Sequence, residues 1–359
     1  MRQNDNKNSY MTHIELEISN PCNEKCIHCY RTCDSTKKGY LNVNQVKNIL
    51  KQAKDLGAKS VTISGGEALL NPQWKQIVQT ADELNFKISL FTNGTLLSKE
   101  DIAFLRLIKN LKEIQISLYA IDESVHDTIT GMKGSCKKTL NAVSLLVENK
   151  LPVFISCPVM KENKTAVLEL IRWCDDNNIQ SCADLFIFCN SDYSNTNLGH
   201  RLSLEELKDF YDNTMKDNAK LSYIWGKSHG KRDLNKIRFY NGASNSLCIA
   251  GDGTIYPAIG WYRPLGNIAI DSLENVFFKN PLLKEIRSIN ASDIVQCKNC
   301  NASDFCDFCF IPHINANQGE PYKVDMEYCR FIGFRKKMAE VRDQQLKKYK
   351  KQHGERYVI

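Results

Sequence analysis

The sequence lacks the long apolar runs and the targeting signals of membrane and secreted proteins. No stretch of its 359 residues approaches the ~20 consecutive apolar residues that a membrane span requires. The first residues, MRQNDNKNSYMTH, are polar and contain no apolar signal core. Internal repeats and low-complexity blocks are also lacking. We therefore expect a cytoplasmic protein without a membrane partner.

Recognisable nucleic-acid-binding modules are lacking as well, although the net charge is +7. Residues 330–359 hold ten Lys or Arg and three Asp or Glu, so this segment alone carries +7. A solvated terminal helix accounts for such a stretch, and a surface for an acidic peptide or another anionic partner is the functional alternative. Nucleic acid is the less favoured partner because no recognition module accompanies the charge.

Cysteine, in contrast, is abundant, with 15 residues. Without a secretory signal, this number favours metal ligation over disulfides. Cys22, Cys26 and Cys29 are the most informative, because they are spaced C-x3-C-x2-C in NPCNEKCIHCY after a strand-like run. Three thiolates on one loop can hold three irons of a cubane cluster and leave the fourth iron open, since such clusters normally take four cysteines. Zinc usually needs four ligands, and His28 would struggle to reach the same metal.

Strand-like and helix-like segments alternate from residue 14 to about 190, a pattern that predicts parallel βα units. Six such units form an open or partial barrel, with the chemistry at the carboxyl ends of the strands. The expected strands are Ile14–Ser19, Ser60–Ser64, Lys87–Phe91, Glu113–Leu118, Pro152–Cys157 and Asp184–Cys189. The expected helices are Asn44–Leu56, Trp74–Leu84, Lys99–Lys109, Cys136–Glu148 and Lys164–Asn177.

Three further motifs follow predicted strands and share the edge of the sheet with the cysteine loop. They are Ser64-Gly65-Gly66-Glu67, Thr92-Asn93-Gly94-Thr95, and the segment that begins at Ser117. Glycines let a backbone approach a ligand closely, and a carboxylate beside them can pair with an ammonium. Each motif alone is consistent with ordinary turn chemistry.

In this order, the motifs resemble those of the radical S-adenosylmethionine (radical SAM) enzymes over residues 14–190. The resemblance implies a partial (β/α)6 TIM-like barrel in which Cys22, Cys26 and Cys29 hold a [4Fe–4S] cluster and the cofactor chelates the open iron. It further implies reductive cleavage of the cofactor to a 5′-deoxyadenosyl radical, which abstracts hydrogen from a substrate. By the same resemblance, the cofactor-binding residues are Gly65, Gly66, Glu67, Asn93 and Ser117.

A second cysteine set lies near the C-terminus, spaced C-x2-C-x5-C-x2-C, and zinc is an open alternative for it. Behind such a barrel the set resembles the SPASM/twitch extension, which carries auxiliary iron–sulfur clusters. Ala258 stands where that family pattern has a cysteine, so the first auxiliary site lacks at least one ligand. The resemblance implies one complete auxiliary [4Fe–4S] site at Cys297, Cys300, Cys306 and Cys329, and an incomplete one at Cys248 and Cys309.

The predicted organisation is an α/β barrel followed by a small cysteine-rich domain. Its parts are a polar arm at 1–13, the barrel core at 14–190, a connector at 191–245, the SPASM/twitch-like domain at 246–335 and a basic tail at 336–359. The resemblance favours a peptide-modifying enzyme that acts on a ribosomally made peptide and is reduced by a flavodoxin or ferredoxin. The alternatives are a radical enzyme on a small molecule and a non-catalytic iron–sulfur or zinc scaffold. Because only about a dozen residues precede the first expected strand, we expect no N-terminal leader-binding domain.

Overall fold

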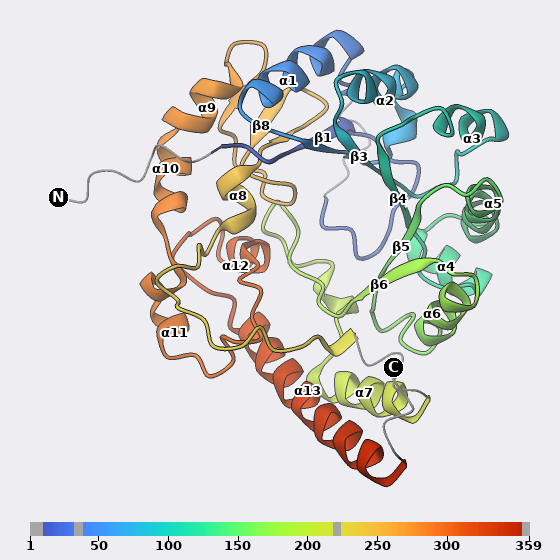
Figure 1. Cartoon of the computed structure of the whole chain (residues 1–359), viewed down its shortest axis with the longest axis vertical. Coiled ribbons are helices and arrows are strands. Elements are labelled where there is room, and N and C mark those ends of the chain that lie inside the picture. Colours follow the sequence, from blue (N-terminus) through green and yellow to red (C-terminus); the bar gives the residue numbers. More distant parts are fainter. Residues whose placement is uncertain (1–9, 32–38, 218–223, 354–359) are drawn as a thin grey trace.

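The structure is a computed structural model that describes residues 10–31, 39–217 and 224–353. Its centre is a nine-stranded sheet in the order β6-β5-β4-β3-β2-β1-β7-β8-β9 (Figure 1). The first six strands are parallel and occur in sequence order. They are β1 (His13–Ser19), β2 (Ser60–Gly65), β3 (Lys87–Thr92), β4 (Leu111–Ser117), β5 (Val153–Pro158) and β6 (Gln180–Asp184).

Helices surround this curved parallel sheet on its outer side (Figure 1). They are α1 (Val43–Asp55), α2 (Trp74–Glu83), α3 (Lys99–Leu105), α4 (Glu123–Thr130), α5 (Ser135–Glu148) and α6 (Val167–Asp176). Capping boxes at Asn42 and Ser98 fix where α1 and α3 begin, because each side chain accepts a hydrogen bond from a backbone N–H of the first turn. The six-unit partial barrel predicted from the sequence is confirmed.

The C-terminal part extends the same sheet beyond β1. Strand β7 (Cys248–Ile249) pairs in parallel with β1, and β8 (Thr254–Tyr256) and β9 (Gly266–Asn267) follow antiparallel. In the sequence, α7 (Leu204–Asp217) lies between the barrel and this part. The remaining helices are α8 (Asn241–Asn245), α9 (Leu273–Lys279), α10 (Pro281–Ser288), α11 (Val295–Lys298), α12 (Phe310–Ala316) and α13 (Met326–His353). This is the predicted cysteine-rich C-terminal region, and its proposed boundaries stay predictions.

The two faces of the parallel sheet differ in chemistry, because successive side chains of a strand point to opposite sides. Ile14, Leu16 and Val61 are fully buried and share one hydrophobic core with the apolar residues of the surrounding helices. The other face is polar: the His13 ring is hydrogen-bonded to the Ser60 and Thr62 hydroxyls. A polar inner face suits a barrel whose interior holds a ligand rather than a packed core.

Two local predictions were wrong. The sixth strand is Gln180–Asp184, not Asp184–Cys189, because the apolar run after Asp184 is buried without joining the ladder. Helix α4 was not predicted, since the eight residues Glu123–Thr130 are too short and too polar to give a clear helical pattern. The predicted polar arm lies mostly outside the described residues, as does the end of the basic tail.

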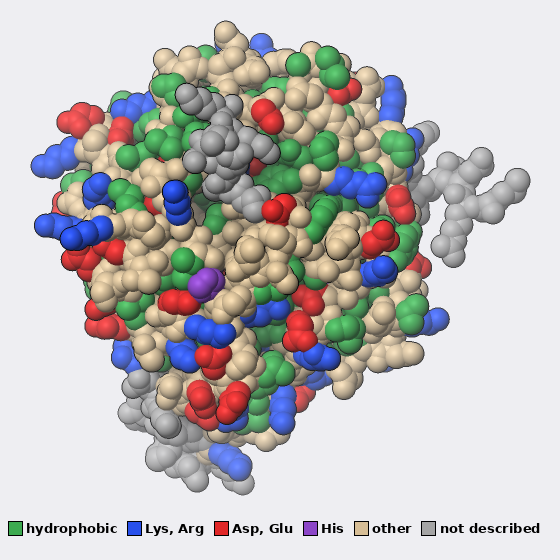
Figure 2. Space-filling view, turned by 180° about the vertical axis from the view of Figure 1, so that it is seen from behind, with side chains coloured by type: hydrophobic (Ala, Val, Ile, Leu, Met, Phe, Trp, Pro, Cys, Tyr) green, Lys and Arg blue, Asp and Glu red, His purple; other side chains and the backbone are tan. Residues whose placement is uncertain are grey.

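The surface shows no dominance of one charge on the face opposite to that of Figure 1. There, Lys and Arg side chains are interspersed with Asp and Glu (Figure 2). Within the part of the chain that the structure describes, no helix combines the length and the apolar character needed to cross a bilayer.

Candidate active site

The three N-terminal cysteines lie on the loop that leaves the carboxyl end of β1, and all three are partly exposed. The backbone of this loop is fixed by the end of α4: the N–H of Lys25 donates to the carbonyl of Thr130 at 2.9 Å, and the N–H of Ile27 donates to that of Ile129 at 2.9 Å. Helix α4 therefore holds the cysteine loop from a distance of about a hundred residues in sequence.

The Gly65-Gly66 turn packs directly on the backbone that leads into Cys22. The Gly66 N–H donates to the Ser19 carbonyl at 2.7 Å, and the Glu67 N–H donates to the Pro21 carbonyl at 2.9 Å. A Cβ on Gly66 would lie 2.4 Å from the Pro21 carbonyl oxygen, and one on Gly65 would lie 2.4 Å from that of Ser19. Both glycines are thus required by a close backbone approach, and the backbone that they approach is that of the cysteine loop.

The Glu67 carboxylate links the turns after β2 and β3. Its two oxygens accept hydrogen bonds from the Leu69 N–H at 2.9 Å, the Thr92 hydroxyl at 2.7 Å and the Asn93 N–H at 2.8 Å. Burial raises the pKa of Glu67, and these hydrogen bonds act in the opposite direction. In this structure the carboxylate therefore positions the two turns, and its predicted contact with an ammonium stays a prediction.

Asn93 joins the turn after β3 to the cysteine loop. Its Nδ2 donates to Asn23 Oδ1 at 2.9 Å, and Asn23 in turn donates to the Thr95 hydroxyl at 2.8 Å. The Thr95 N–H and hydroxyl both donate to Asn93 Oδ1. Asn23, which was not singled out in the sequence, is one residue beyond Cys22, so this network holds the first cysteine against the third strand.

A group of aromatic rings covers the other side of the cysteine loop, beside Ser117 at the end of β4. The Tyr119 hydroxyl donates to Cys26 Sγ at 3.8 Å. The Tyr119 ring meets His28 edge-on at 4.8 Å and stacks on His126 at 5.3 Å. His126 lies on α4, where burial lowers its pKa to about 4 and keeps it neutral.

The donor set at this edge fits the implied cofactors. Among the described residues, four buried polar atoms close to the cysteine loop have no hydrogen-bond partner: Ser64 Oγ, Glu24 Oε1, His28 Nδ1 and His126 Nε2. Such atoms suit a site that a polar ligand completes. In the described ranges, no group of three or more His, Cys, Asp or Glu side chains is placed to hold a single metal ion. The cysteines of a cubane need not converge on one point, because each binds a different iron.

The comparison with known proteins agrees with this geometry. Residues 16–174, which run from β1 into α6, match the family described as the radical SAM superfamily. The protein is a radical SAM enzyme. The resemblance that the cysteine, Gly-Gly-Glu and Ser-Leu-Tyr motifs indicated is confirmed, together with catalysis rather than a scaffold role. Its cofactors are S-adenosylmethionine and the radical SAM [4Fe–4S] cluster.

Relatives of this radical SAM enzyme include two proteins of Bacillus subtilis (strain 168). The chain is 25% identical to the antilisterial bacteriocin subtilosin biosynthesis protein AlbA over 322 residues, which is 85% of this chain and 68% of AlbA. It is 28% identical to the sporulation killing factor maturation protein SkfB, covering 44% of this chain and 38% of SkfB. An AdoMet-dependent heme synthase of Methanosarcina barkeri (strain Fusaro / DSM 804) is also 28% identical, over 42% of this chain and 43% of the synthase. The chain thus spans less than half the length of the last two.

Two solved structures share the fold of this radical SAM enzyme. Streptococcus suis SuiB bound to S-adenosylmethionine superposes with a TM-score of 0.69 at 20% identity, over 89% of this chain and 77% of SuiB. The protein anSMEcpe with bound AdoMet superposes with a TM-score of 0.68 at 18% identity, over 93% of this chain and 99% of that protein. In both cases the likeness extends past the barrel into the C-terminal region.

The structure brings four C-terminal cysteines of the radical SAM enzyme together. Burial raises the pKa of Cys297, and the neighbouring Cys306, Cys329 and Cys300 raise it further. Cys329 is contributed by α13, and the other three come from α11 and the turns that follow it. These are the four residues predicted to hold a complete auxiliary cluster.

The two remaining candidates, Cys248 and Cys309, have different neighbours. Burial raises the pKa of both thiols. The charges that act on Cys248 are those of Glu17, Glu15 and Arg31, whereas those on Cys309 are Asp184, Cys306 and Asp307. The position of the missing ligand, Ala258, is buried. The single complete auxiliary site therefore stays a prediction.

A buried polar cluster beside Cys248 was missed in the sequence. The side chain of Glu17 is only 1% exposed. It forms an ion pair with Arg31 at 2.7 Å and accepts a hydrogen bond from the Tyr262 hydroxyl at 2.5 Å. Glu15 accepts a hydrogen bond from the Ile259 N–H at 2.6 Å. The available signal was the placement of two glutamates at alternate positions of the otherwise apolar strand Ile14–Ser19. The cluster ties β1 and the cysteine loop to the C-terminal region.

Replacing Glu15 by glutamine is expected to change how stability depends on pH. Burial raises the pKa of Glu15 to about 7, against the weaker opposing effect of the Ile259 N–H. The folded state therefore retains this proton between the ordinary glutamate pKa and about 7, so the free energy of unfolding falls as pH rises through that window, by about 1–3 kcal/mol. Anaerobic urea denaturation of the native and Glu15→Gln proteins at pH 5 and pH 8 measures the difference.

The native protein should lose this stability relative to Glu15→Gln between the two pH values. The exposed Glu148 of α5 supplies the control, because Glu148→Gln should follow the native protein. Parallel pH profiles for the native and Glu15→Gln proteins would show that Glu15 ionises normally.

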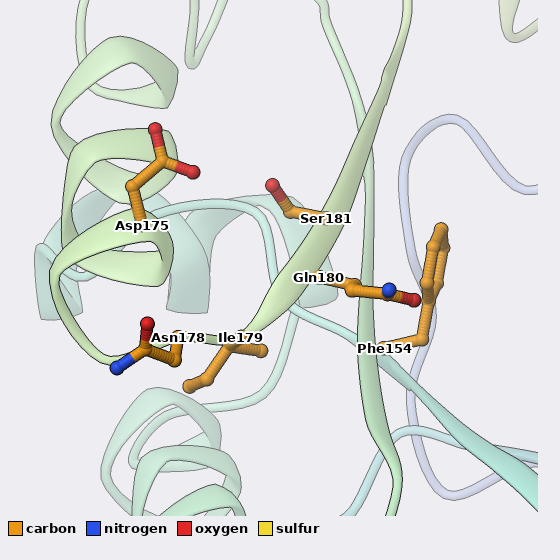
Figure 3. Close-up of a pocket in the computed structure, with 6 residues that line it drawn as sticks. All are labelled: Phe154, Asp175, Asn178, Ile179, Gln180 and Ser181. Atoms are coloured by element: carbon orange, nitrogen blue, oxygen red, sulfur yellow. The ribbon is translucent and has the colours of Figure 1, made fainter.

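One open pocket lies away from the active site. A cavity of about 490 Å³ is lined by Phe154, Asp175, Asn178, Ile179, Gln180 and Ser181, at the amino ends of β5 and β6 (Figure 3). Figure 3 shows Gln180 pointing toward Phe154 on one side of β6, with Asp175 on the helix side. Because the cysteine loop lies at the carboxyl ends of the strands, this cavity is not part of the candidate site.

Proposed function

We propose that this radical SAM enzyme modifies a ribosomally made peptide by a crosslink, a thioether or an epimerisation. The observation that carries the proposal is the match to AlbA, a bacteriocin biosynthesis protein, over 85% of the chain. SkfB is named as a maturation protein, and SuiB and anSMEcpe have been solved with peptides bound. The polar inner face of the barrel is compatible with a peptide backbone.

The proposed roles follow the family resemblance. Cys22, Cys26 and Cys29 would hold the radical SAM cluster. Gly65, Gly66 and Glu67 would contact the methionyl amine, Ser117 would lie near the ribose, and Asn93 would support the loop. When the [4Fe–4S] cluster and S-adenosylmethionine are bound, the chemistry supplied at this site is one-electron cleavage to methionine and a 5′-deoxyadenosyl radical. Cys297, Cys300, Cys306 and Cys329 hold an auxiliary [4Fe–4S] cluster, with Cys248 and Cys309 as weaker candidates.

The protein's own contribution is to position these groups and to exclude water. The turns after β2 and β3 are locked to the cysteine loop by Glu67 and Asn93, so the loop does not need to reorganise when the cofactor binds. The reducing partner is proposed to be a flavodoxin or ferredoxin of the cytoplasm.

A small-molecule substrate is the second candidate. It is favoured by the matches to the AdoMet-dependent heme synthase and to a probable GTP 3′,8-cyclase of Methanocaldococcus jannaschii, 28% identical over 45% of this chain. These matches cover less than half of the chain, whereas the AlbA match covers 85% of it. The coverage therefore favours the peptide.

Mass spectrometry on the anaerobically reconstituted enzyme tests the proposal. Small peptides encoded beside the gene are incubated with S-adenosylmethionine and a reductant, and a peptide of changed mass should accompany 5′-deoxyadenosine. The same mixtures without reductant are the control and should show neither product. Formation of 5′-deoxyadenosine while every peptide keeps its mass would favour the small-molecule candidate.

A further inference from the structure

An exposed basic loop lies on the surface before α8. It comprises residues 227–232 with the sequence KSHGKR and is called the basic loop here. Its first five residues are all exposed, and only Arg232 is half-buried. The loop is far in sequence from the C-terminal cysteines, and nothing in the sequence connected the two.

The basic loop is bonded directly to the cysteine-bearing segment between α11 and α12. The His229 N–H donates to the Asp304 carbonyl at 2.7 Å. The Arg232 guanidinium donates to the carbonyl oxygens of Ser303 and Cys306, and it lies 5.0 Å from the centre of the Phe308 ring. The backbone carbonyl of one proposed cluster ligand, Cys306, is therefore a direct contact of this loop.

The carboxylates next to the basic loop are already paired with basic side chains. Lys336 Nζ lies 2.8 Å from the Asp304 carboxylate, and Arg335 Nη1 lies 3.9 Å from that of Asp307. Lys236 Nζ lies 3.8 Å from the Asp233 carboxylate. Lys227 and Lys231 form no ion pair with any described residue, and both are exposed. The two lysines thus supply unpaired positive charge on a loop that contacts the cysteine-bearing segment.

We propose that the basic loop is the docking site of an acidic electron-donor protein that reduces the auxiliary cluster. The proposal rests on the proposed function, because it requires an iron–sulfur cluster at Cys297, Cys300, Cys306 and Cys329. The donor, a flavodoxin-type or ferredoxin-type protein with an acidic surface, loses one electron and the auxiliary cluster gains it. No bond is made or broken in this step, and no proton has to move.

Charge and proximity together favour this partner. Electron transfer slows steeply with distance, so a productive donor has to dock close to the cluster that it reduces. Uncompensated surface charges steer an oppositely charged protein and raise its association rate by 10–10³-fold, and this effect weakens as salt is added. A positive surface in contact with the backbone of a cluster-binding segment meets both requirements.

Stopped-flow reduction under anaerobic conditions tests the proposal on the full-length reconstituted enzyme. The donor is a purified acidic flavodoxin held in its hydroquinone state, and cluster bleaching is followed at low and high salt. Lys227→Glu combined with Lys231→Glu reverses the charge of the basic loop. Lys47→Glu combined with Lys51→Glu is the matched control, because these two exposed lysines lie on α1, which is at the top of Figure 1 and away from α11 at the lower left.

The basic-loop variant should be reduced by flavodoxin at least about tenfold more slowly at low salt, and its rate should lose most of its salt dependence. The α1 variant should behave as the native enzyme. Photoreduced deazaflavin, a small donor without a docking surface, should reduce the auxiliary cluster of all three proteins at the same rate. Equal flavodoxin rates for the native enzyme and the basic-loop variant would overturn the proposal.

The deazaflavin measurement also separates this proposal from the proposed function. If no auxiliary cluster is reduced by deazaflavin in the native enzyme, electron entry through it is ruled out. Cleavage of S-adenosylmethionine and modification of a peptide can still be measured in the same sample, so the proposed function is judged independently.

Discussion

Simultaneous replacement of Cys22, Cys26 and Cys29 by alanine is expected to remove the cleavage of S-adenosylmethionine. The rate of 5′-deoxyadenosine formation should fall below about 1% of the native rate, because a cluster without its thiolates is not held. Electron paramagnetic resonance of the reduced protein should lose the S = 1/2 signal that changes when S-adenosylmethionine is added. Signals that do not respond to the cofactor should remain, since we assign them to the proposed auxiliary cluster.

Cys174→Ala is the matched control for this experiment, since Cys174 is fully buried on α6 and belongs to the hydrophobic core. It should lower stability slightly and leave the cofactor-responsive signal in place. A triple variant that kept this signal would show that the cluster is bound elsewhere, and the interpretation of the N-terminal loop would be wrong.

The second large effect is expected for Gly66→Ala, a change that adds a single methyl group. The new Cβ would lie 2.4 Å from the Pro21 carbonyl oxygen and 2.6 Å from that of Asn20, closer than any packing tolerates. The cysteine loop has to shift, so we expect loss of most of the iron at the N-terminal site and an activity loss close to that of the triple cysteine variant. Overpacking of this kind typically destabilises a protein by about 1–3 kcal/mol.

Iron and sulfide analysis, with cofactor-dependent paramagnetic resonance, measures this effect. Gly199→Ala provides the comparison, because nothing lies within 4 Å of the Cβ position there. That variant should assemble its clusters normally. Normal cluster content in Gly66→Ala would mean that the turn after β2 moves freely relative to the cysteine loop, in conflict with the hydrogen bonds from Gly66 and Glu67.

The barrel was predictable because its evidence is local. Each of the first five strands is a short apolar run bounded by turn residues, and the structure places each within two residues of its predicted bounds. The sixth was misplaced since Gln180–Asp184 is an edge strand with no buried residue, whereas the apolar run after it is buried without pairing. An apolar run indicates that a segment is buried, not that it pairs as a strand. Here the paired segment is Gln180–Asp184, and the buried segment is the apolar run that follows it.

The contacts that assemble the site were predictable only in part. The cysteines and the Gly-Gly-Glu turn have fixed spacing, which is visible in the sequence. The Tyr262–Glu17 hydrogen bond joins residues 245 positions apart, and Arg232 reaches the Cys306 carbonyl across 74 positions. Such pairs depend on how the C-terminal region folds back on the barrel, and no spacing or periodicity in one sequence encodes that arrangement.

The parallel pairing of β7 with β1 has a consequence for biosynthesis. During translation the first strand of the barrel emerges early, whereas its partner on one side, Cys248–Ile249, is made more than two hundred residues later. Until then, the β1 edge of the nascent sheet has unpaired backbone N–H and C=O groups, and such an edge promotes aggregation between chains. The same delay leaves the Glu17 carboxylate without Tyr262, so the barrel can mature fully only once the C-terminal half has left the ribosome.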